Sequence, residues 1–320
     1  MKDNFGRNIE YLRISLTDRC NFRCTYCMPI KGIDLVSHQE ILTFEEIYTL
    51  AIIFSQKGIR HIRFTGGEPL LRKGICNLIA MVNSIPKIED VTLTTNGFFL
   101  ENMADKLKEA GLSRINISLD TFNPIKFEKI TKSGDLNAVL RGIDRAIAVG
   151  FSPIKLNYVV MRGINDDEIL SFIEFADKKG IEIKFIELMP NNTNNFPVKM
   201  FQYLLFSGKE IREKIPYKMK KREKTGMGPE ESFILENGVK IGFINAISHN
   251  FCHLCNRIRV SSTGLLAPCL MSSVGINLKK GLRPKVRPEL LNDLIDEALL
   301  NKPEGHDNYD FISDMSRIGG

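Results

Sequence analysis

The chain has 320 residues, of which 43% are hydrophobic and 26% charged, and it carries a formal net charge of +6 at pH 7. These proportions are typical of a globular protein and exclude a disordered or collagen-like chain. The longest apolar run, Leu50–Phe54, is far shorter than the roughly 20 residues that cross a bilayer, and the polar start Met1–Glu10 holds no apolar signal segment. We therefore expect a cytoplasmic protein without membrane contact, in a compartment where disulfides are disfavoured.

Short β-type runs alternate with helical patterns from the start of the chain to about Pro190, as in consecutive βα units. This alternation predicts six parallel strands joined by right-handed crossovers. The predicted strands are Tyr11–Leu16, His61–Thr65, Val91–Thr95, Arg114–Leu119, Lys155–Val160 and Ile183–Leu188. Reactive groups of such folds lie at the carboxyl ends of the strands. The residues expected there are Cys20, Gly66, Asn96, Asp120 and Met189.

Two of the predicted crossover helices have clear start and stop signals. Thr43 and Glu46 form a capping-box pair ahead of an apolar stripe, and Gly58 ends that helix. Asn165, followed by two aspartates, is predicted to cap a second helix, which Gly180 stops.

The predicted fold class is α/β. Six βα units can close partly into a barrel or lie open as a doubly wound sheet, and pattern alone does not separate the two. Because the composition changes after Pro190, where an Asn-rich stretch begins, we place a domain boundary between residues 1–190 and 191–320.

The second region contains two recognisable elements. Asn237 followed by Gly238 predicts a hairpin over Ser232–Ile247, and this dipeptide suits a tight type I′ turn. A last helix is predicted at Pro288–Leu300.

Six of the seven cysteines fall into two triplets, and the first is Cys20, Cys24 and Cys27, directly after the first predicted strand. Three thiolates this close can hold three irons of a cubane cluster and leave the fourth iron open for a substrate or cofactor. A zinc site would need a fourth ligand, for which His38 is available, but zinc loops do not account for the x3-x2 spacing. The spacing therefore predicts an iron–sulfur cluster.

The second triplet is Cys252, Cys255 and Cys269. Taken alone it fits a zinc ribbon completed by His249 or His253 as well as it fits a cluster. Beside a first cluster with an open iron, the balance favours a second three-liganded iron–sulfur cluster.

Two basic runs, Lys218–Lys224 and Lys279–Arg287, supply much of the positive charge. Such runs are usually solvated faces, and a positive surplus otherwise favours an anionic ligand such as a nucleotide, or weak contact with nucleic acid. The chain has no tryptophan and lacks the interleaved aromatic and basic residues of RNA-binding modules, so we expect no nucleic-acid partner. A zinc-bearing nucleic-acid-binding module is kept as one alternative.

Three longer motifs and the end of the chain resemble one family. They are Arg13–Pro29, Arg63–Pro69, Phe251–Arg259 and the final Gly319 and Gly320. Together they resemble the GTP 3′,8-cyclases of molybdenum cofactor biosynthesis, a family within the radical S-adenosylmethionine (SAM) superfamily, over essentially the whole chain. The first motif is shared by the superfamily, whereas the second cysteine triplet and the double-glycine end are specific to this family.

The resemblance implies a partial (βα)6 TIM-like barrel with a C-terminal extension that carries a second iron–sulfur cluster. It implies a lyase that converts GTP to (8S)-3′,8-cyclo-7,8-dihydroguanosine 5′-triphosphate, the first step of molybdenum cofactor biosynthesis. The implied cofactors are SAM and two [4Fe–4S] clusters. Their metal ligands would be Cys20, Cys24, Cys27, Cys252, Cys255 and Cys269.

The resemblance also assigns roles to individual residues. Those matched to SAM contacts are Tyr26, Gly66, Gly67, Glu68, Ser118 and Met189. Those matched to GTP contacts are Arg13, Arg63, Thr94, Lys155, Arg257, Ile258 and Arg259. Those matched to catalytic positions are Arg13, Arg257, Arg259, Gly319 and Gly320, the last two as a tail that threads into the active site. Several cations are what a triphosphate needs, and arginine forks pair bidentately with phosphate oxygens.

Partners follow from the same resemblance: an electron donor such as flavodoxin or ferredoxin, and cyclic pyranopterin monophosphate synthase as the next enzyme. The sequence leaves the oligomeric state open, a homodimer being one option. A radical SAM peptide-modifying enzyme with an auxiliary cluster is the second alternative, although such extensions usually hold more cysteines than the three found here.

Overall fold

The computed structural model describes residues 1–29, 31–190, 198–223, 229–272 and 275–305. Its strands are β1 (Tyr11–Ser15), β2 (His61–Thr65), β3 (Asp90–Thr95), β4 (Arg114–Ser118), β5 (Ile154–Val160), β6 (Glu182–Glu187), β7 (Met219–Lys221), β8 (Glu231–Leu235), β9 (Lys240–Ile244), β10 (Arg257–Val260), β11 (Leu265–Ala267) and β12 (Ile276–Asn277). Its α-helices are α1 (Phe44–Gln56), α2 (Ile75–Asn83), α3 (Leu100–Glu109), α4 (Pro124–Thr131), α5 (Leu136–Ala148), α6 (Ile169–Lys179), α7 (Val198–Leu204), α8 (Gly208–Glu213), α9 (Lys279–Leu282) and α10 (Pro288–Leu300). Two short 3-10 helices are η1 (Pro69–Leu71) and η2 (Cys252–Leu254).

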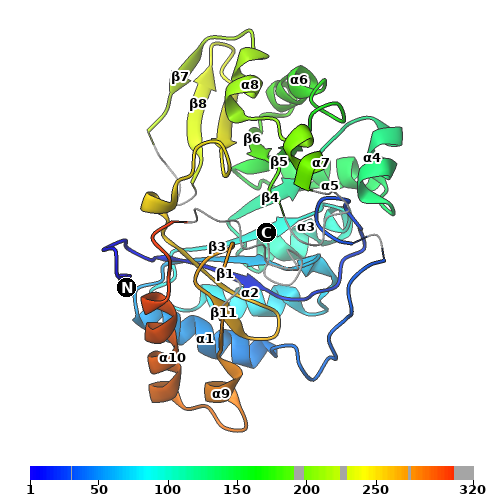
Figure 1. Cartoon of the computed structure of the whole chain (residues 1–320). Coiled ribbons are helices and arrows are strands. Elements are labelled where there is room, and N and C mark those ends of the chain that lie inside the picture. Colours follow the sequence, from blue (N-terminus) through cyan, green and yellow to red (C-terminus); the bar gives the residue numbers. More distant parts are fainter. Residues whose placement is uncertain (30, 191–197, 224–228, 273–274, 306–320) are drawn as a thin grey trace.

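All the described strands form one sheet, in the order β12-β11-β10-β1-β2-β3-β4-β5-β6-β9-β8-β7 (Figure 1). Strands β1 to β6 are parallel neighbours in chain order. This sequential order is that of a barrel and excludes a doubly wound sheet, whose strand order reverses. Because β12 and β7 are the two edges, the sheet stays open. The predicted α/β fold is confirmed.

The C-terminal region extends the sheet on both sides. Strand β10 lies parallel beside β1, and β9 lies parallel beside β6, whereas β7, β8, β11 and β12 pair antiparallel. Residues far apart in sequence are thereby brought to the two flanks of the parallel core.

The six predicted strands match β1 to β6 to within one residue at each end. Side chains alternate between the faces of a strand. On β1, Leu12 and Ile14 are fully buried in the hydrophobic core, while Arg13 between them lines a cavity. One face of the sheet therefore builds the core with the crossover helices, and the other carries the polar groups.

Helix boundaries follow the predicted signals with one exception. The capping box of Thr43 and Glu46 starts α1, and Gly180, with φ of 66°, ends α6. The prediction that Asn165 caps α6 is wrong, because α6 begins at Ile169 after Glu168, which makes no side-chain cap bond. The Asn165 side chain instead forms hydrogen bonds with the backbone of Asp120, Val159 and Met161. The predicted helix at Pro288–Leu300 is confirmed as α10.

The predicted hairpin is confirmed as β8 and β9, but its predicted type I′ turn is wrong. That turn needs positive φ at both central residues. Only Gly238 of the pair has it, with φ of 89°. The Gly238 amide donates to the Leu235 carbonyl, and Leu235 then pairs with Val239, so the loop is a three-residue turn that ends on the glycine.

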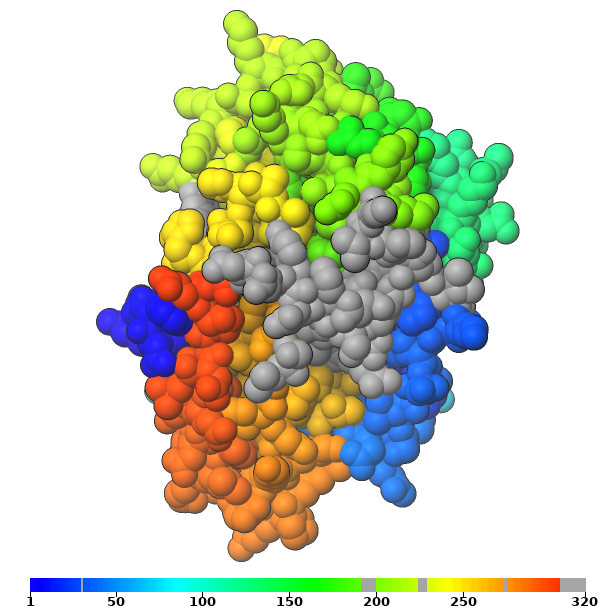
Figure 2. Space-filling model, in the orientation of Figure 1, coloured from blue at the N-terminus to red at the C-terminus, as the bar shows by residue number. Residues whose placement is uncertain are grey.

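The first residues of the chain lie beside the C-terminal end of α10, as Figure 2 shows by the contact of dark blue and red atoms. Arg7 fixes this contact, because its guanidinium donates to the carbonyls of Pro303 (2.6 Å) and Glu304 (2.8 Å). Both ends of the described chain thus meet behind Cys252, whose carbonyl Arg7 also binds at 2.7 Å.

Candidate active site

A cavity of about 360 Å³ lies on the inner face of the sheet and reaches the carboxyl ends of its parallel strands. Most of the site residues predicted from sequence line it: Arg13, Cys20, Cys24, Tyr26, Cys27, Arg63, Gly66, Gly67, Thr94, Ser118, Lys155, Met189, Cys252, Cys255, Arg257, Arg259 and Cys269. Glu68 and Ile258 are fully buried and do not line it. Gly319 and Gly320 lie outside the described residues.

The first cysteine triplet lies on a loop held by backbone hydrogen bonds. The Cys27 amide donates to the Cys24 carbonyl at 2.9 Å, and Asn96, after β3, donates from Nδ2 to the Cys20 sulfur at 3.9 Å. Burial raises the pKa of Cys20 to about 12 and that of Cys24 well above its ordinary value. These thiols keep their protons in the metal-free protein, and metal binding would displace them.

Gly66 and Gly67 let two backbone segments touch. A Cβ on Gly66, which has φ of 147°, would lie 2.7 Å from the Thr17 carbonyl oxygen, and one on Gly67 would lie 2.2 Å from that of Arg19. The Gly67 amide donates to Thr17 at 2.8 Å. The glycines therefore bring the end of β2 against the segment that leads into Cys20.

Glu68 stands behind the cavity wall. Its carboxylate accepts from the Thr95 hydroxyl (2.8 Å), the Asn96 amide (2.7 Å) and the Leu70 amide (3.0 Å), and burial raises its pKa to about 7. Through these bonds Glu68 joins the ends of β2 and β3 and fixes Asn96 beside the cysteine loop.

Tyr26, between the second and third cysteines, is anchored by Asp120 at the end of β4. The tyrosine hydroxyl donates to Asp120 Oδ2 at 2.7 Å, and Oδ1 accepts from the Val159 amide at 2.9 Å. Burial raises the pKa of Asp120 to about 6. The cysteine loop is thus tied to the ends of both β4 and β5.

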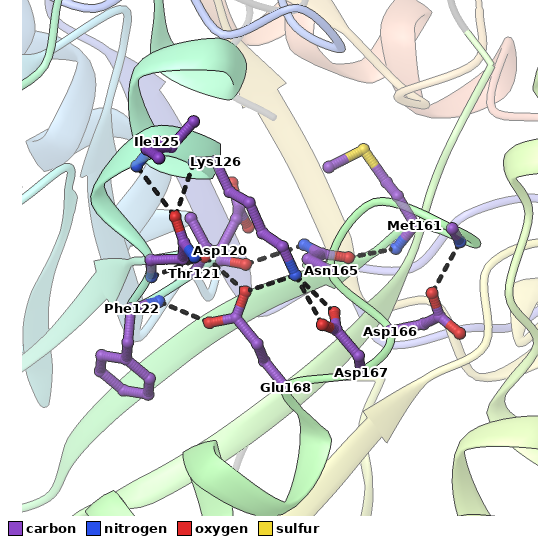
Figure 3. Close-up of polar contacts among 12 residues, drawn as sticks. Asp120, Thr121, Phe122, Ile125, Lys126, Met161, Asn165, Asp166, Asp167 and Glu168 are labelled. Atoms are coloured by element: carbon purple, nitrogen blue, oxygen red, sulfur yellow. Dashed lines mark hydrogen bonds and ion pairs between the residues drawn. The ribbon is translucent and has the colours of Figure 1, made fainter.

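The Asn165 side chain links the segment after β4 to the end of β5 (Figure 3). Its Nδ2 donates to the carbonyls of Asp120 (2.8 Å) and Val159 (2.9 Å), and its Oδ1 accepts from the Met161 amide at 2.7 Å. The side chain is fully buried, so each of these bonds replaces water that cannot reach the same groups.

A second set of contacts braces the same loops from outside. Glu168 accepts from the Thr121 hydroxyl (2.5 Å) and the Phe122 amide (2.7 Å), and Lys126 forms ion pairs with Asp167 (2.6 Å) and Glu168 (3.2 Å) (Figure 3). These contacts join the segments that follow β4 and β5, on the side of the cavity that carries the first cysteine triplet.

The opposite part of the cavity carries a row of arginines set by strand register. Arg13 on β1 lies directly between Arg259 on β10 and Arg63 on β2. Burial, with the charge of Arg257 adding to it, lowers the pKa of Arg259 to about 10, and burial followed by Arg259 lowers that of Arg13. A row of partly desolvated like charges is unfavourable on its own, so the arrangement fits a polyanionic ligand.

Two lysines extend this positive region. Lys155 Nζ lies 2.9 Å from Glu230 Oε1, and Lys184 Nζ lies 2.7 Å from Glu230 Oε2. Burial lowers the pKa of Lys184 to about 8, and Glu230 opposes that shift. The carboxylate of Glu230 thus holds both ammonium groups at the cavity wall.

The second cysteine triplet closes the arginine end of the cavity. Cys252 is the first residue of η2, Cys255 directly follows that helix, and Cys269 follows β11. Burial alone would raise the pKa of Cys255, but the charges of Arg257 and Lys302 outweigh burial and lower it to about 7.

Both triplets supply only thiols, the side chains that ligate iron–sulfur clusters. All six cysteines are free thiols. Within the described part of the chain, no three His, Cys, Asp or Glu side chains gather around one point as a mononuclear zinc site requires. The ligands of a cubane are less tightly gathered, because each sulfur binds a different iron.

Sequence reasoning missed several residues that line the cavity or support its walls. Lys184 and Glu230 line the cavity, and the signal for Lys184 was a lysine between the apolar residues Ile183 and Phe185 of a predicted strand. Asp120 was placed at a strand end but given no partner. Asn165 was assigned to a helix start, and Lys302 carried no signal at all.

Two family models match the chain. The model of the radical SAM superfamily covers residues 14–176, and that of Molybdenum Cofactor Synthesis C covers residues 181–308. The fold and the cysteine-lined cavity define a radical SAM protein, a class that implies SAM and a [4Fe–4S] cluster as cofactors.

Full-length relatives identify the family within the radical SAM superfamily. The chain is 43% identical to the GTP 3′,8-cyclase of Petrotoga mobilis and 44% identical to that of Thermodesulfovibrio yellowstonii, in each case over 100% of both chains. The chain belongs to the GTP 3′,8-cyclase family. The predicted family is confirmed, and the zinc-bearing module and the peptide-modifying enzyme are set aside.

Solved structures agree on the fold. The peptide-bound crystal structure of Streptococcus suis SuiB aligns with a TM-score of 0.65 at 13% identity, covering 98% of this chain and 77% of that one. The hydrogenase maturase HydG aligns with a TM-score of 0.52 at 18% identity, covering 65% and 48%. At these identities the likeness concerns the fold alone.

Across the described residues, every helix is too short or too polar to span a bilayer.

Proposed function

We propose that this chain converts GTP to (8S)-3′,8-cyclo-7,8-dihydroguanosine 5′-triphosphate, the first step of molybdenum cofactor biosynthesis. The observation that carries the proposal is the register of Arg259, Arg13 and Arg63 across three adjacent strands, in the same cavity that both cysteine triplets line. Family membership supplies the reaction, and the arginine row supplies a place for the triphosphate.

We assign the first cluster to Cys20, Cys24 and Cys27, which leaves one iron open for SAM. SAM bound there supplies the one-electron chemistry that starts the reaction. Tyr26, Ser118 and Met189 line the cavity beside these cysteines and are proposed to hold SAM. Gly66, Gly67 and Glu68 act there by shaping the wall.

We assign a second [4Fe–4S] cluster to Cys252, Cys255 and Cys269, with its open iron toward the guanine base. Its position next to Arg257 and Arg259 would place base and triphosphate of one nucleotide at the same end of the cavity.

The chain's own residues have two tasks, binding and exclusion. Arg13, Arg63 and Arg259 are proposed to bind phosphate oxygens, with Lys155 and Thr94 at the side of the row. A contact from Ile258 would have to come from its backbone, since its side chain is in the core. Enclosure between the two cysteine loops keeps water and stray hydrogen donors away from reactive carbon atoms. The catalytic assignment of Gly319 and Gly320 stays a prediction.

The remaining partners are also proposals: flavodoxin or ferredoxin as electron donor, cyclic pyranopterin monophosphate synthase as the consumer of the product, and a homodimer as one option for assembly. The cytoplasmic location and the boundary between residues 1–190 and 191–320 stay predictions as well.

The test is anaerobic incubation of the reconstituted protein with SAM, a reductant and GTP, followed by chromatography of the nucleotides. The proposal expects 5′-deoxyadenosine and the cyclised nucleotide in parallel. Formation of 5′-deoxyadenosine without any cyclised nucleotide would reject GTP as substrate while leaving the superfamily chemistry intact.

A further inference from the structure

A buried lysine lies directly behind the second cysteine triplet. Lys302, just after α10, is 3% exposed. Its Nζ donates to the carbonyls of Pro268 (2.6 Å) and Arg257 (2.9 Å) and to the Cys255 sulfur (3.5 Å). Since a lysine ammonium has three protons, all of its donors are used.

These acceptors join the two parts of the triplet. Pro268 precedes Cys269, and Arg257 lies two residues after Cys255. One ammonium group therefore fixes the backbone on both sides of the gap between the second and third cysteines of the triplet.

The charge of Lys302 lacks a carboxylate partner among the described residues, since no ion pair joins it to Asp or Glu there. A buried ammonium bound by two neutral carbonyls is costly unless an anion lies near. The Cys255 sulfur, 3.5 Å from Nζ, is the acceptor of Lys302 that can carry a negative charge. The anion that the site calls for is thus cysteine sulfur, or a cluster bound to it.

Arg7 is a second cation beside this triplet, and it differs from Lys302 in having a carboxylate partner. It too contacts the triplet, because its guanidinium donates to the Cys252 carbonyl where the first residues of the chain lie beside the end of α10 (Figure 2). However, Arg7 is already paired with Asp3, whose Oδ2 lies 2.5 Å from its Nε. Of these two cations, Lys302 is the one whose charge is left for the sulfur atoms.

The depth of Lys302 is set by α10. Leu291, Ile295, Ala298 and Leu299 on that helix are buried in the core, and the Lys302 amide donates to the Leu299 carbonyl at 3.1 Å. The ammonium is therefore held in place by packing and is not free to reach solvent.

We propose that Lys302 is a positioning residue for the second iron–sulfur cluster, whose Cys255 ligand it binds through an N–H···S hydrogen bond and whose reduced form its buried charge stabilises. Hydrogen bonds to sulfur and the net charge around a cluster are two of the factors that set its reduction potential. A fixed cation favours the reduced, more negative state. The inference rests on the proposed second cluster.

The experiment measures the second cluster alone, in full-length protein in which Cys20, Cys24 and Cys27 are changed to alanine. Iron and sulfide are counted after anaerobic reconstitution, and the reduction potential is followed by electron paramagnetic resonance. Lys302→Met removes charge and donor, Lys302→Gln keeps a donor without the charge, and Lys302→Arg keeps the charge. The matched control is Lys285→Met, which removes one charge from an exposed site.

We expect Lys302→Met and Lys302→Gln to shift the potential to more negative values, with Lys302→Arg closer to the parent and Lys285→Met unchanged. Loss of the cluster in Lys302→Met, with the cluster kept in Lys302→Arg and Lys285→Met, would equally support the positioning role. A full cluster with the parent potential in both Lys302→Met and Lys302→Gln would overturn the inference. If the parent itself bound no iron, the second cluster would be refuted and this inference with it, an outcome that the iron count of the parent distinguishes.

Discussion

The two cysteine loops share one cavity but have opposite electrostatic surroundings. Near the first triplet the neighbouring charges are Glu68 and Asp120, which both raise thiol pKa values. Near the second triplet they are Arg257 and Lys302, which lower the pKa of Cys255. One end of the cavity thus suits a cationic ligand, as SAM is, and the other a polyanion such as GTP.

This contrast gives each end its own role in the proposed reaction. A sulfonium cofactor placed beside Asp120 and a triphosphate placed among the arginines would each enter the cavity in only one orientation. Two similar cysteine triplets can therefore lie beside different ligands. Changes at the first triplet should affect SAM cleavage or binding, and changes at the arginine end should affect GTP binding.

The largest effect is expected at the first triplet. Cys24→Ala removes one of three proposed ligands of the first cluster and should lower 5′-deoxyadenosine formation below detection. The control is Cys76→Ala, since Cys76 lies half-buried in α2 and does not line the cavity. SAM cleavage retained in Cys24→Ala would refute the first-cluster assignment.

At the arginine end, the double change of Arg257 and Arg259 to alanine should weaken GTP binding by at least roughly 100-fold, since each charge-assisted hydrogen bond contributes about 1.5–3 kcal/mol. The iron content should stay the same. Equilibrium binding measures the effect.

The matched control changes Arg141 and Arg145 to alanine, two exposed arginines paired with Glu101 and Asp105 on the helical side. An equal change in GTP affinity in the two double variants would count against the proposed triphosphate site.

A smaller, mixed effect is expected from Asn165→Ala. Loss of this side chain leaves the Asp120 and Val159 carbonyls and the Met161 amide without a partner, and should cost roughly 3 kcal/mol in the free energy of unfolding. SAM affinity should also fall, because Asp120 anchors Tyr26, whereas GTP affinity should change little.

Urea unfolding and SAM binding measure these two effects, with the exposed Asn137→Ala as control. If the Asn165→Ala protein were destabilised but bound SAM with normal affinity, Asn165 would support the fold without positioning Tyr26 for SAM binding.

The smallest effect concerns pH. In the free protein Lys184 has a pKa of about 8, lowered by burial and held up by Glu230, so it loses its positive charge as the pH rises through that value. GTP affinity should therefore decline above about pH 8. Glu230→Gln removes the group that raises this pKa, so the decline should begin at lower pH.

The pH profile of GTP binding checks this shift. The control is Glu231→Gln, because the neighbouring Glu231 pairs with Arg212 and does not line the main cavity. Identical profiles in the two variants would contradict the role of Glu230.

Local signals predicted the local features well. Alternation located β1 to β6 within a residue, and the capping box of Thr43 and Glu46 defined the start of α1. Cysteine spacing identified both triplets as candidates. These features depend on neighbours in sequence, which a single sequence displays.

Features that depend on distant partners were not predictable. Asn165 carries a helix-cap signal, but its bonds to Asp120 and Val159 depend on how β4 and β5 pair. Nothing in the sequence around Lys302 predicts its contact with Cys255, because that contact depends on how α10 packs. The arginine row of Arg259, Arg13 and Arg63 likewise depends on the pairing of β10 with β1. The hydrophobic periodicity of the sequence does not predict that pairing.

An anaerobic crystal structure of the reconstituted protein with SAM and GTP tests the central claim most directly. We expect SAM at the cluster of Cys20, Cys24 and Cys27, and the triphosphate along Arg259, Arg13 and Arg63 with the base toward the second triplet. A nucleotide bound away from this row, or a fourth side chain completing either cysteine triplet, would contradict the account.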